Sequence, residues 1–130
     1  MAFPVEENNF EVFTVGSKEK VKNLILDEIF PKSHFESVSW GDSMSILSTE
    51  IIQEVENLPN VRLLKTFEEG VPRDKIIERR GQALLVDVFL TGSNTITECG
   101  KLVNLDMIGN RVAGITFGPK NDIKHLKFLR

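Results

Sequence analysis

The alternation of apolar and polar positions divides the chain into segments with strand or helix periodicity. Residues 10–15 alternate and are rich in aromatic and β-branched side chains, which favours a strand. Residues 85–91 form a nearly continuous apolar run, which is typical of a strand covered on both faces. With two shorter apolar segments included, the pattern predicts strands at 10–15, 36–40, 61–66 and 85–91.

Helical periodicity lies between these strands and predicts helices at 18–30, 43–58 and 73–84. The first helix has Ser17 as a candidate N-cap and ends at Pro31. The second carries an apolar stripe at three- and four-residue spacing, formed by Met44, Leu47, Ile51, Val55 and Leu58.

This alternation of strands and helices predicts a three-layer α/β fold with a mainly parallel sheet. A length of 130 residues fits one domain, so we expect a single domain over 1–130. An all-antiparallel sheet, or a 44–58 stripe that faces solvent, would contradict this prediction.

Composition and charge narrow the function classes. A formal net charge of −3 gives no basic face for nucleic acid, and no apolar stretch reaches the roughly 18 residues that span a membrane. The single cysteine, Cys99, cannot form an internal disulfide or hold an iron–sulfur cluster, which indicates a reducing, cytoplasmic compartment. The two histidines, His34 and His125, are far apart in sequence, so we expect no protein-held metal and no cofactor.

Polar and glycine residues that could bind a ligand gather after the apolar strand 85–91. Gly92-Ser93-Asn94 opens a loop at the carboxyl end of that strand, the edge where open α/β sheets bind ligands. Residues 95–104 suggest a hairpin that turns at Cys99-Gly100. Gly109-Asn110-Arg111 leads into a short predicted helix at 112–117, whose amino end would offer N–H groups to an anion.

The run DVFLTGSNTITECGKLVNLDMIGNRVAGITFGPK, residues 87–120, resembles the signature of the LUD-domain family, which includes lactate utilisation protein C. The segment VSWGDSMSI at 38–46 resembles the first glycine–serine loop of the same family, and the likeness extends over about residues 10–120. The resemblance implies a Rossmann-like three-layer α/β sandwich related to the NagB/RpiA/CoA-transferase-like fold. It also implies a ligand cleft between residues 40–45 and 92–111.

The chain departs from related patterns at three places. Asn94 stands where the more distantly similar methylthioribose-phosphate isomerases use an acid/base aspartate, so that mechanism is not carried over. Met107-Ile108 replaces a small residue that is common in the family. Longer relatives continue with another strand, whereas 121–130 matches an apolar strand poorly, so we expect the family's C-terminal part to be lacking.

The candidate ligand-binding residues come from both loops and are Gly41, Ser43, Ser45, Gly92, Asn94, Asn104, Asp106, Gly109, Asn110 and Arg111. The asparagines could equally stabilise turns, and the serines could cap a helix. A cation at a helix start is disfavoured by the helix dipole, so Arg111 should pair with Asp106 or face an anionic ligand. Alanine at Asn94 or Arg111 is expected to weaken ligand binding and to leave the fold largely intact.

The acid/base candidates are Glu98 and Asp106, which follow the same strand. Cys99 is interpreted as a turn residue, since Lys101 is the only nearby cation that would lower its pKa. Asp87, inside an apolar strand, is interpreted as a hydrogen-bonded structural residue.

Two functions from different classes remain. The family resemblance implies an accessory protein that binds a small anion, a carboxylate or phosphate, and assists oxidation of lactate to pyruvate beside oxidoreductase partners. The alternative is an isomerase- or CoA-transferase-like enzyme that acts on a phosphosugar or an acyl-CoA. Because the sheet is expected to be incomplete, we also expect a homo-oligomer or a larger complex.

Overall fold

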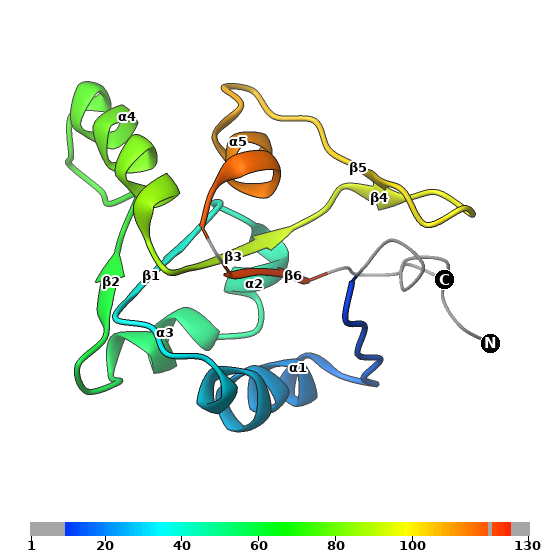
Figure 1. Ribbon diagram of the computed structural model, residues 1–130. Coiled ribbons are helices and arrows are strands. Elements are labelled where there is room, and N and C mark those ends of the chain that lie inside the picture. The colour runs from blue at the N-terminus through cyan, green and yellow to red at the C-terminus, as the bar shows by residue number, and fades with distance from the viewer. Residues whose placement is uncertain (1–9, 120, 126–130) are drawn as a thin grey trace.

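A parallel sheet lies at the centre of the computed structural model, which describes residues 10–119 and 121–125 (Figure 1). Within this part of the chain the sheet has four strands in the order β2-β1-β3-β6. These are β1 (Ser37–Trp40), β2 (Arg62–Leu64), β3 (Val88–Gly92) and β6 (Asn121–His125). Each neighbouring pair is parallel, so the predicted parallel sheet is confirmed.

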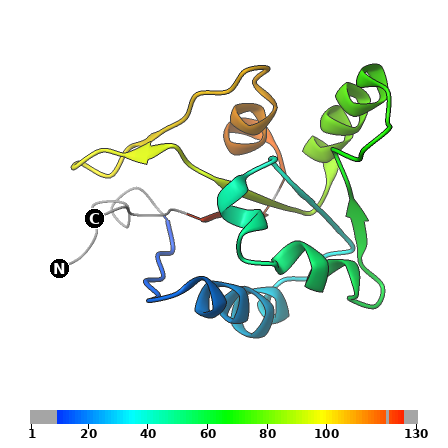
Figure 2. The same ribbon diagram turned by 180° about the vertical axis from the view of Figure 1, so that it is seen from behind.

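Helices cover both faces of the sheet, as Figures 1 and 2 show from opposite sides. On one face lie α1 (Lys18–Leu24), its continuation η2 (Ile25–Ile29) and η3 (Phe30–Lys32), with α2 (Met44–Leu47) and α3 (Ile51–Glu56). On the other lie α4 (Arg73–Gln82), η4 (Ala83–Leu85) and α5 (Asn110–Phe117). The predicted α/β class with a sheet between two helical layers is therefore confirmed.

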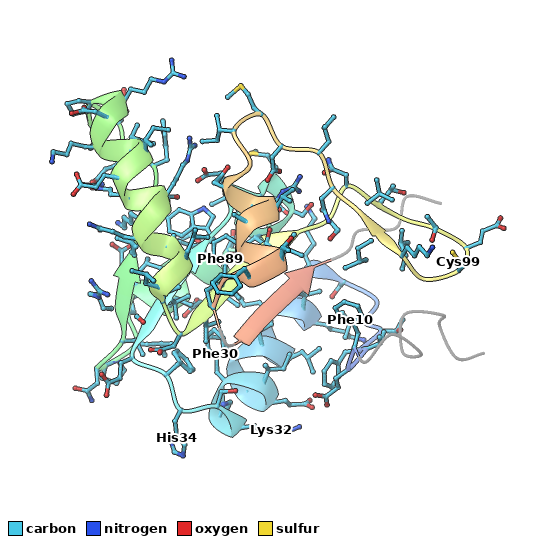
Figure 3. All side chains as sticks on the ribbon, turned by 45° about the horizontal axis from the view of Figure 1, so that its top comes forward. Phe10, Phe30, Lys32, His34, Phe89 and Cys99 are labelled. Atoms are coloured by element: carbon cyan, nitrogen blue, oxygen red, sulfur yellow. The ribbon has the colours of Figure 1, made fainter. Side chains whose placement is uncertain are left out.

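The two faces of the sheet are packed by alternate residues of the same strands. Val38 in β1 and Leu90 in β3 belong to the core cluster shared with η2 and α3. Phe89 is 2% exposed and points the other way, toward α5 (Figure 3), where its ring contacts Gly114. Because β3 is buried on both sides, its sequence shows a continuous apolar run and no alternation.

The starts of β1 and β3 are joined by Asp87. Its carboxylate Oδ2 accepts hydrogen bonds from the backbone N–H of Glu36 (2.9 Å), from that of Ser37 (3.0 Å) and from the Ser37 hydroxyl (2.9 Å). The interpretation of Asp87 as a hydrogen-bonded structural residue is confirmed.

The strand predicted at 10–15 is wrong, because this segment has no regular structure and pairs with no strand among the described residues. Phe10 and Phe13 are 38% and 39% exposed. An alternating pattern forms a stable strand only where a neighbouring strand accepts its backbone hydrogen bonds.

The helix predicted at 43–58 is interrupted at Thr49-Glu50 and becomes α2 and α3. The Thr49 hydroxyl donates to the Ile46 carbonyl (2.6 Å), and Glu50 takes a left-handed φ of 60°. Such side-chain bonds compete with the helical ladder. The break turns Met44 to solvent at 76% exposure and Leu47 to partial exposure, so the predicted stripe is wrong in its first half. The side chains buried here are instead Ile46, Ile51, Ile52 and Val55.

The remaining elements follow the predicted segments with shifted ends. The predicted strand at 85–91 begins only at Val88, because η4 occupies Ala83–Leu85 and leaves Leu85 85% exposed. Residues 121–125, which match an apolar strand poorly, nevertheless form β6 beside β3.

No helix in the described ranges is long and apolar enough to cross a bilayer. The single-domain boundary, the missing family part and the expected oligomer stay predictions.

Candidate functional site

A pocket of about 540 Å³ lies at the carboxyl ends of β1 and β3. These strands are neighbours, but the chain leaves β1 toward α2 on one face and leaves β3 toward α5 on the other. Such a divergence is the topological switch point at which open α/β sheets bind ligands. The fold therefore brings the two predicted loops to one place.

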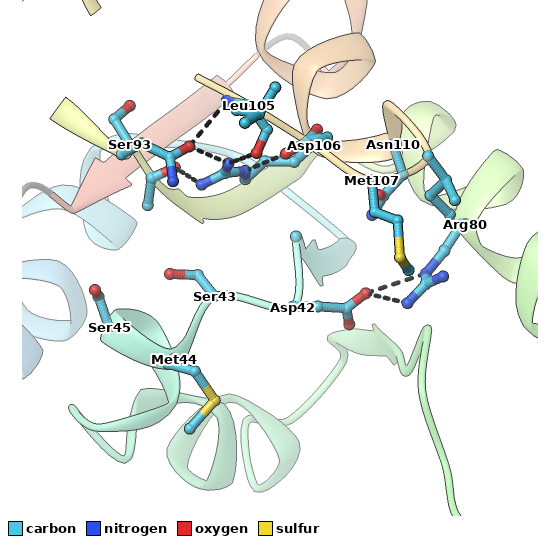
Figure 4. Close-up of a pocket in the computed structure, with 15 residues that line it drawn as sticks. Asp42, Ser43, Met44, Ser45, Arg80, Ser93, Leu105, Asp106, Met107 and Asn110 are labelled. Atoms are coloured by element: carbon cyan, nitrogen blue, oxygen red, sulfur yellow. Dashed lines mark hydrogen bonds and ion pairs between the residues drawn. The ribbon is translucent and has the colours of Figure 1, made fainter. Parts of the chain in front are cut away.

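The first wall is the turn after β1. Gly41 lets this turn pack closely against Thr91 and Arg111, because a Cβ at this position would lie 3.0 Å from Thr91 Oγ1 and 3.1 Å from Arg111 Cγ. Asp42 follows with a left-handed φ of 53°, a conformation that asparagine and aspartate tolerate better than most residues. Its Oδ1 accepts from the Thr66 hydroxyl (2.9 Å), and its Oδ2 accepts from Nε (3.1 Å) and Nη2 (2.7 Å) of Arg80 in α4 (Figure 4).

Ser43 caps α2, since its Oγ accepts from the Ile46 N–H (3.5 Å). Ser45 lines the pocket one turn further on. The four-residue α2 is too short for a substantial dipole, so hydroxyl groups rather than a helix end face the pocket here.

The second wall is held together by Arg111. Its Nε donates to Asp106 Oδ1 (2.8 Å), its Nη1 to the Gly92 carbonyl (3.1 Å), and its Nη2 to the Leu105 carbonyl (3.1 Å) and to Asn94 Oδ1. The ion pair is largely buried, with side chains 13% exposed for Arg111 and 8% for Asp106. The Arg111 guanidinium thus joins the end of β3 and residues 105–106 to α5, the helix that carries it.

Asp106 also caps α5. Its Oδ2 accepts from the Val112 N–H (2.6 Å), while Gly109 precedes the helix with a left-handed φ of 80°. The amino end of α5, expected to attract a ligand anion, therefore already carries a carboxylate of the protein. The helix begins at Asn110, two residues before the predicted start.

Two polar groups of the loop after β3 have no hydrogen-bond partner among the described residues. The Ser93 hydroxyl is buried and has no hydrogen-bond partner within the described ranges. Asn94 uses its Oδ1 to accept from the Leu105 N–H (3.0 Å) and from Arg111, and its Nδ2 has no partner in the part of the chain that the structure describes. Both residues line the pocket.

The hairpin that follows consists of β4 (Thr95–Ile96) and β5 (Leu102–Val103). At its base, Asn104 Oδ1 accepts from the Asn94 N–H (3.4 Å), so Asn104 supports the loop from outside the lining. Glu98 and Cys99 lie exposed at the hairpin turn, Cys99 at the tip seen in Figure 3. The structure does not bring Glu98 into the pocket, which leaves Asp106 as the acid/base candidate at the site.

Most of the predicted site residues come together. The lining includes Gly41, Ser43, Ser45, Gly92, Asn94, Asp106, Asn110 and Arg111, whereas Asn104 and Gly109 lie beside it. The lining also contains residues that were not predicted, the polar Asp42, Ser93 and Arg80 and the apolar Met44, Leu105, Met107 and Ile108. Ser93 and Asp42 stand within the two predicted loops and could have been included, but nothing in the sequence connects Arg80 with the turn after β1.

The charged side chains of the pocket form two ion pairs of one acid and one base, Asp42–Arg80 and Asp106–Arg111. Their formal charges sum to zero. All four carboxylate oxygens accept hydrogen bonds from the protein. No cluster of three or more metal-ligating side chains occurs among the residues described. The arrangement is suited to hydrogen bonding of a small polar group, and each lining carboxylate already contacts an arginine.

Outside the pocket, the Thr97 hydroxyl lies 3.1 Å from Cys99 Sγ and lowers the pKa of that thiol, with a further contribution from Lys101. Only the thiolate is nucleophilic, so a lower pKa increases its fraction near neutral pH.

We expect Thr97→Val to raise the thiol pKa and to slow alkylation by iodoacetamide near neutral pH. At a pH above both pKa values the two rates should converge. Thr97→Ser keeps the hydroxyl and serves as the control; superimposable pH–rate profiles for wild type and Thr97→Val would refute the effect.

Comparison with known proteins identifies the family of the chain. No curated protein and no solved structure matches the chain significantly. A family model, the LUD domain, matches residues 4–125 and so covers the whole pocket and the sheet around it. The chain therefore belongs to the LUD-domain family.

Proposed function

We propose that this protein binds a small monocarboxylate in the pocket between β1 and β3, assists the oxidation of lactate to pyruvate and acts without catalysing a reaction. LUD domains are associated with lactate utilisation proteins, which supplies the metabolic context. In this proposal, oxidoreductase partner proteins carry out the oxidation of lactate to pyruvate.

The observation that carries the proposal is the Ser93 hydroxyl. A buried polar group without a partner destabilises a protein by about 1–3 kcal/mol, so such groups are uncommon and call for an explanation, such as a partner from outside the protein. Ser93 lines the pocket beside the unused Nδ2 of Asn94. A carboxylate has two acceptor oxygens and could take one hydrogen bond from each residue.

The contacts of the acidic residues support binding over catalysis. An isomerase or CoA-transferase needs a carboxylate that can exchange a proton or attack the substrate. Asp42 and Asp106, the acidic residues of the lining, are both held by arginines, and Asn94 cannot exchange a proton. The enzyme alternative therefore lacks a free catalytic carboxylate at this pocket.

The test is Ser93→Ala, which should have opposite effects on stability and on binding. Removing the unsatisfied hydroxyl should raise the free energy of unfolding of the ligand-free protein by about 1 kcal/mol. Losing one hydrogen bond to a charged ligand should weaken lactate binding by roughly 10-fold. Urea denaturation and isothermal titration calorimetry measure the two effects.

Ser33→Ala, in the turn after η3 and away from the pocket, should change neither quantity. A Ser93→Ala variant that binds lactate as tightly as the wild type would contradict the proposal. Turnover of a phosphosugar or acyl-CoA by the purified wild-type protein would establish the enzyme alternative instead.

A further inference from the structure

Four apolar side chains of the lining of this polar pocket are exposed. Met107 is 94% exposed, Leu105 83%, Met44 76% and Ile108 39%. We infer that the ligand is amphipathic: a monocarboxylate head at the polar floor and an unbranched hydrocarbon chain of several carbons against the rim that these side chains form. The inference rests on the proposed function and specifies its ligand class.

The position of the rim follows from the Arg111 network. Asp106 turns inward to hold Arg111 and to cap α5, with 8% of its side chain exposed. In Figure 4 the Met107 side chain extends from the same segment toward the Asp42–Arg80 pair on the opposite wall. Its thioether therefore lies beside the Asp42–Arg80 pair, and its side chain is 94% exposed. A flexible, polarisable methionine adapts readily to an apolar ligand surface.

Size also favours a ligand larger than lactate. Lactate has six non-hydrogen atoms, and at roughly 30 Å³ each, the volume of a water molecule in the liquid, it would fill about a third of 540 Å³. The volume falls within the range of about 300–1,000 Å³ that is typical of pockets for larger organic ligands. Additional carbons could occupy the remainder and cover the rim.

The charge balance of the lining limits the head group to no more than one negative charge. The formal charges of the ionisable side chains in the lining sum to zero, and both guanidinium groups already contact carboxylates. A phosphate dianion, or the several phosphates of coenzyme A, would find no uncompensated cation here. A carboxylate needs only hydrogen-bond donors, which Ser93 and Asn94 provide.

The experiment measures dissociation constants for 2-hydroxy acids of increasing chain length, from lactate through 2-hydroxyhexanoate to 2-hydroxyoctanoate. Each methylene that is buried should tighten binding by about 4-fold. Met107→Ser should reduce this increment per carbon, and Leu105→Ser should do the same. Phe117→Ser is the matched control, because Phe117 is 92% exposed at the far end of α5 and outside the lining, so the increment should persist.

The outcomes separate the two proposals. Lactate binding that depends on Ser93, combined with equal affinity along the series, would overturn the amphipathic ligand and leave the proposed function standing. Longer acids that bind equally well to wild type and Ser93→Ala would overturn the placement of the head group and the proposed function. If Phe117→Ser reduces the gain in affinity per carbon as much as Met107→Ser does, the result would also count against the rim. Hexyl phosphate that binds more tightly than 2-hydroxyhexanoate would overturn the monocarboxylate class.

Discussion

Replacing Arg111 with alanine should lower the free energy of unfolding by about 3–5 kcal/mol, the usual cost of removing one partner from a buried ion pair. The substitution leaves Asp106, whose side chain is 8% exposed, without its cation, and it removes the contacts to the Gly92 and Leu105 carbonyls. Urea denaturation followed by circular dichroism measures the loss. This expected loss of stability differs from the prediction made from the sequence, in which alanine at Arg111 leaves the fold largely intact.

Arg79→Ala is the matched control. Arg79 pairs with Glu68 on the surface of α4, where the two side chains are 32% and 52% exposed, so its loss should cost about 1 kcal/mol or less. If Arg111→Ala does not fold, adding Asp106→Asn removes the uncompensated charge and should recover part of the stability. Equal losses for Arg79→Ala and Arg111→Ala would show that the buried network contributes little.

Gly114→Ala and Gly81→Ala should change stability in opposite directions, although both replace a glycine inside a helix. A Cβ at Gly114 would lie 2.7 Å from Phe89 Cε1, while one at Gly81 has nothing within 4 Å. Overpacking between α5 and β3 should cost about 1–3 kcal/mol. At Gly81, in α4, alanine should add up to about 1 kcal/mol because of its higher helix propensity.

A second variant locates the cause of the Gly114 effect. In a Phe89→Leu background the ring that meets the new Cβ is gone, so Gly114→Ala should cost less than in the wild type. Thermal and urea unfolding of the four proteins give the coupling free energy of the pair. A coupling near zero, or stabilisation by Gly114→Ala in the wild type, would contradict the close contact.

The proximity of the two loops could be predicted from the sequence more readily than the contacts between their side chains. Loops such as 41–45 and 92–94 follow strands of one parallel sheet, so the carboxyl ends of those strands bring them to a common edge. The Asp106–Arg111 pair could be anticipated because its members are five residues apart at a helix start. Arg80 is 38 residues from Asp42, and only the packing of α4 brings the two together.

The remaining errors in the fold have different local causes. The pattern at 43–58 has helical spacing throughout, and the break depends on one threonine hydroxyl and a left-handed Glu50. The strand expected at 10–15 required a partner strand, which periodicity cannot supply. β6 forms beside β3 although its sequence is polar, because backbone pairing does not require apolar side chains.

The helix that carries Arg80 is itself weakly anchored. None of the residues of α4 is buried, so few apolar contacts oppose its separation from the sheet. Segments of this kind open locally at a lower free energy than the core, often without global unfolding. Each such opening would withdraw Arg80 from Asp42 and remove one side of the pocket while the Arg111 network stays assembled. The fraction of molecules with a complete pocket should therefore follow the local opening equilibrium of α4 more closely than the global stability of the protein.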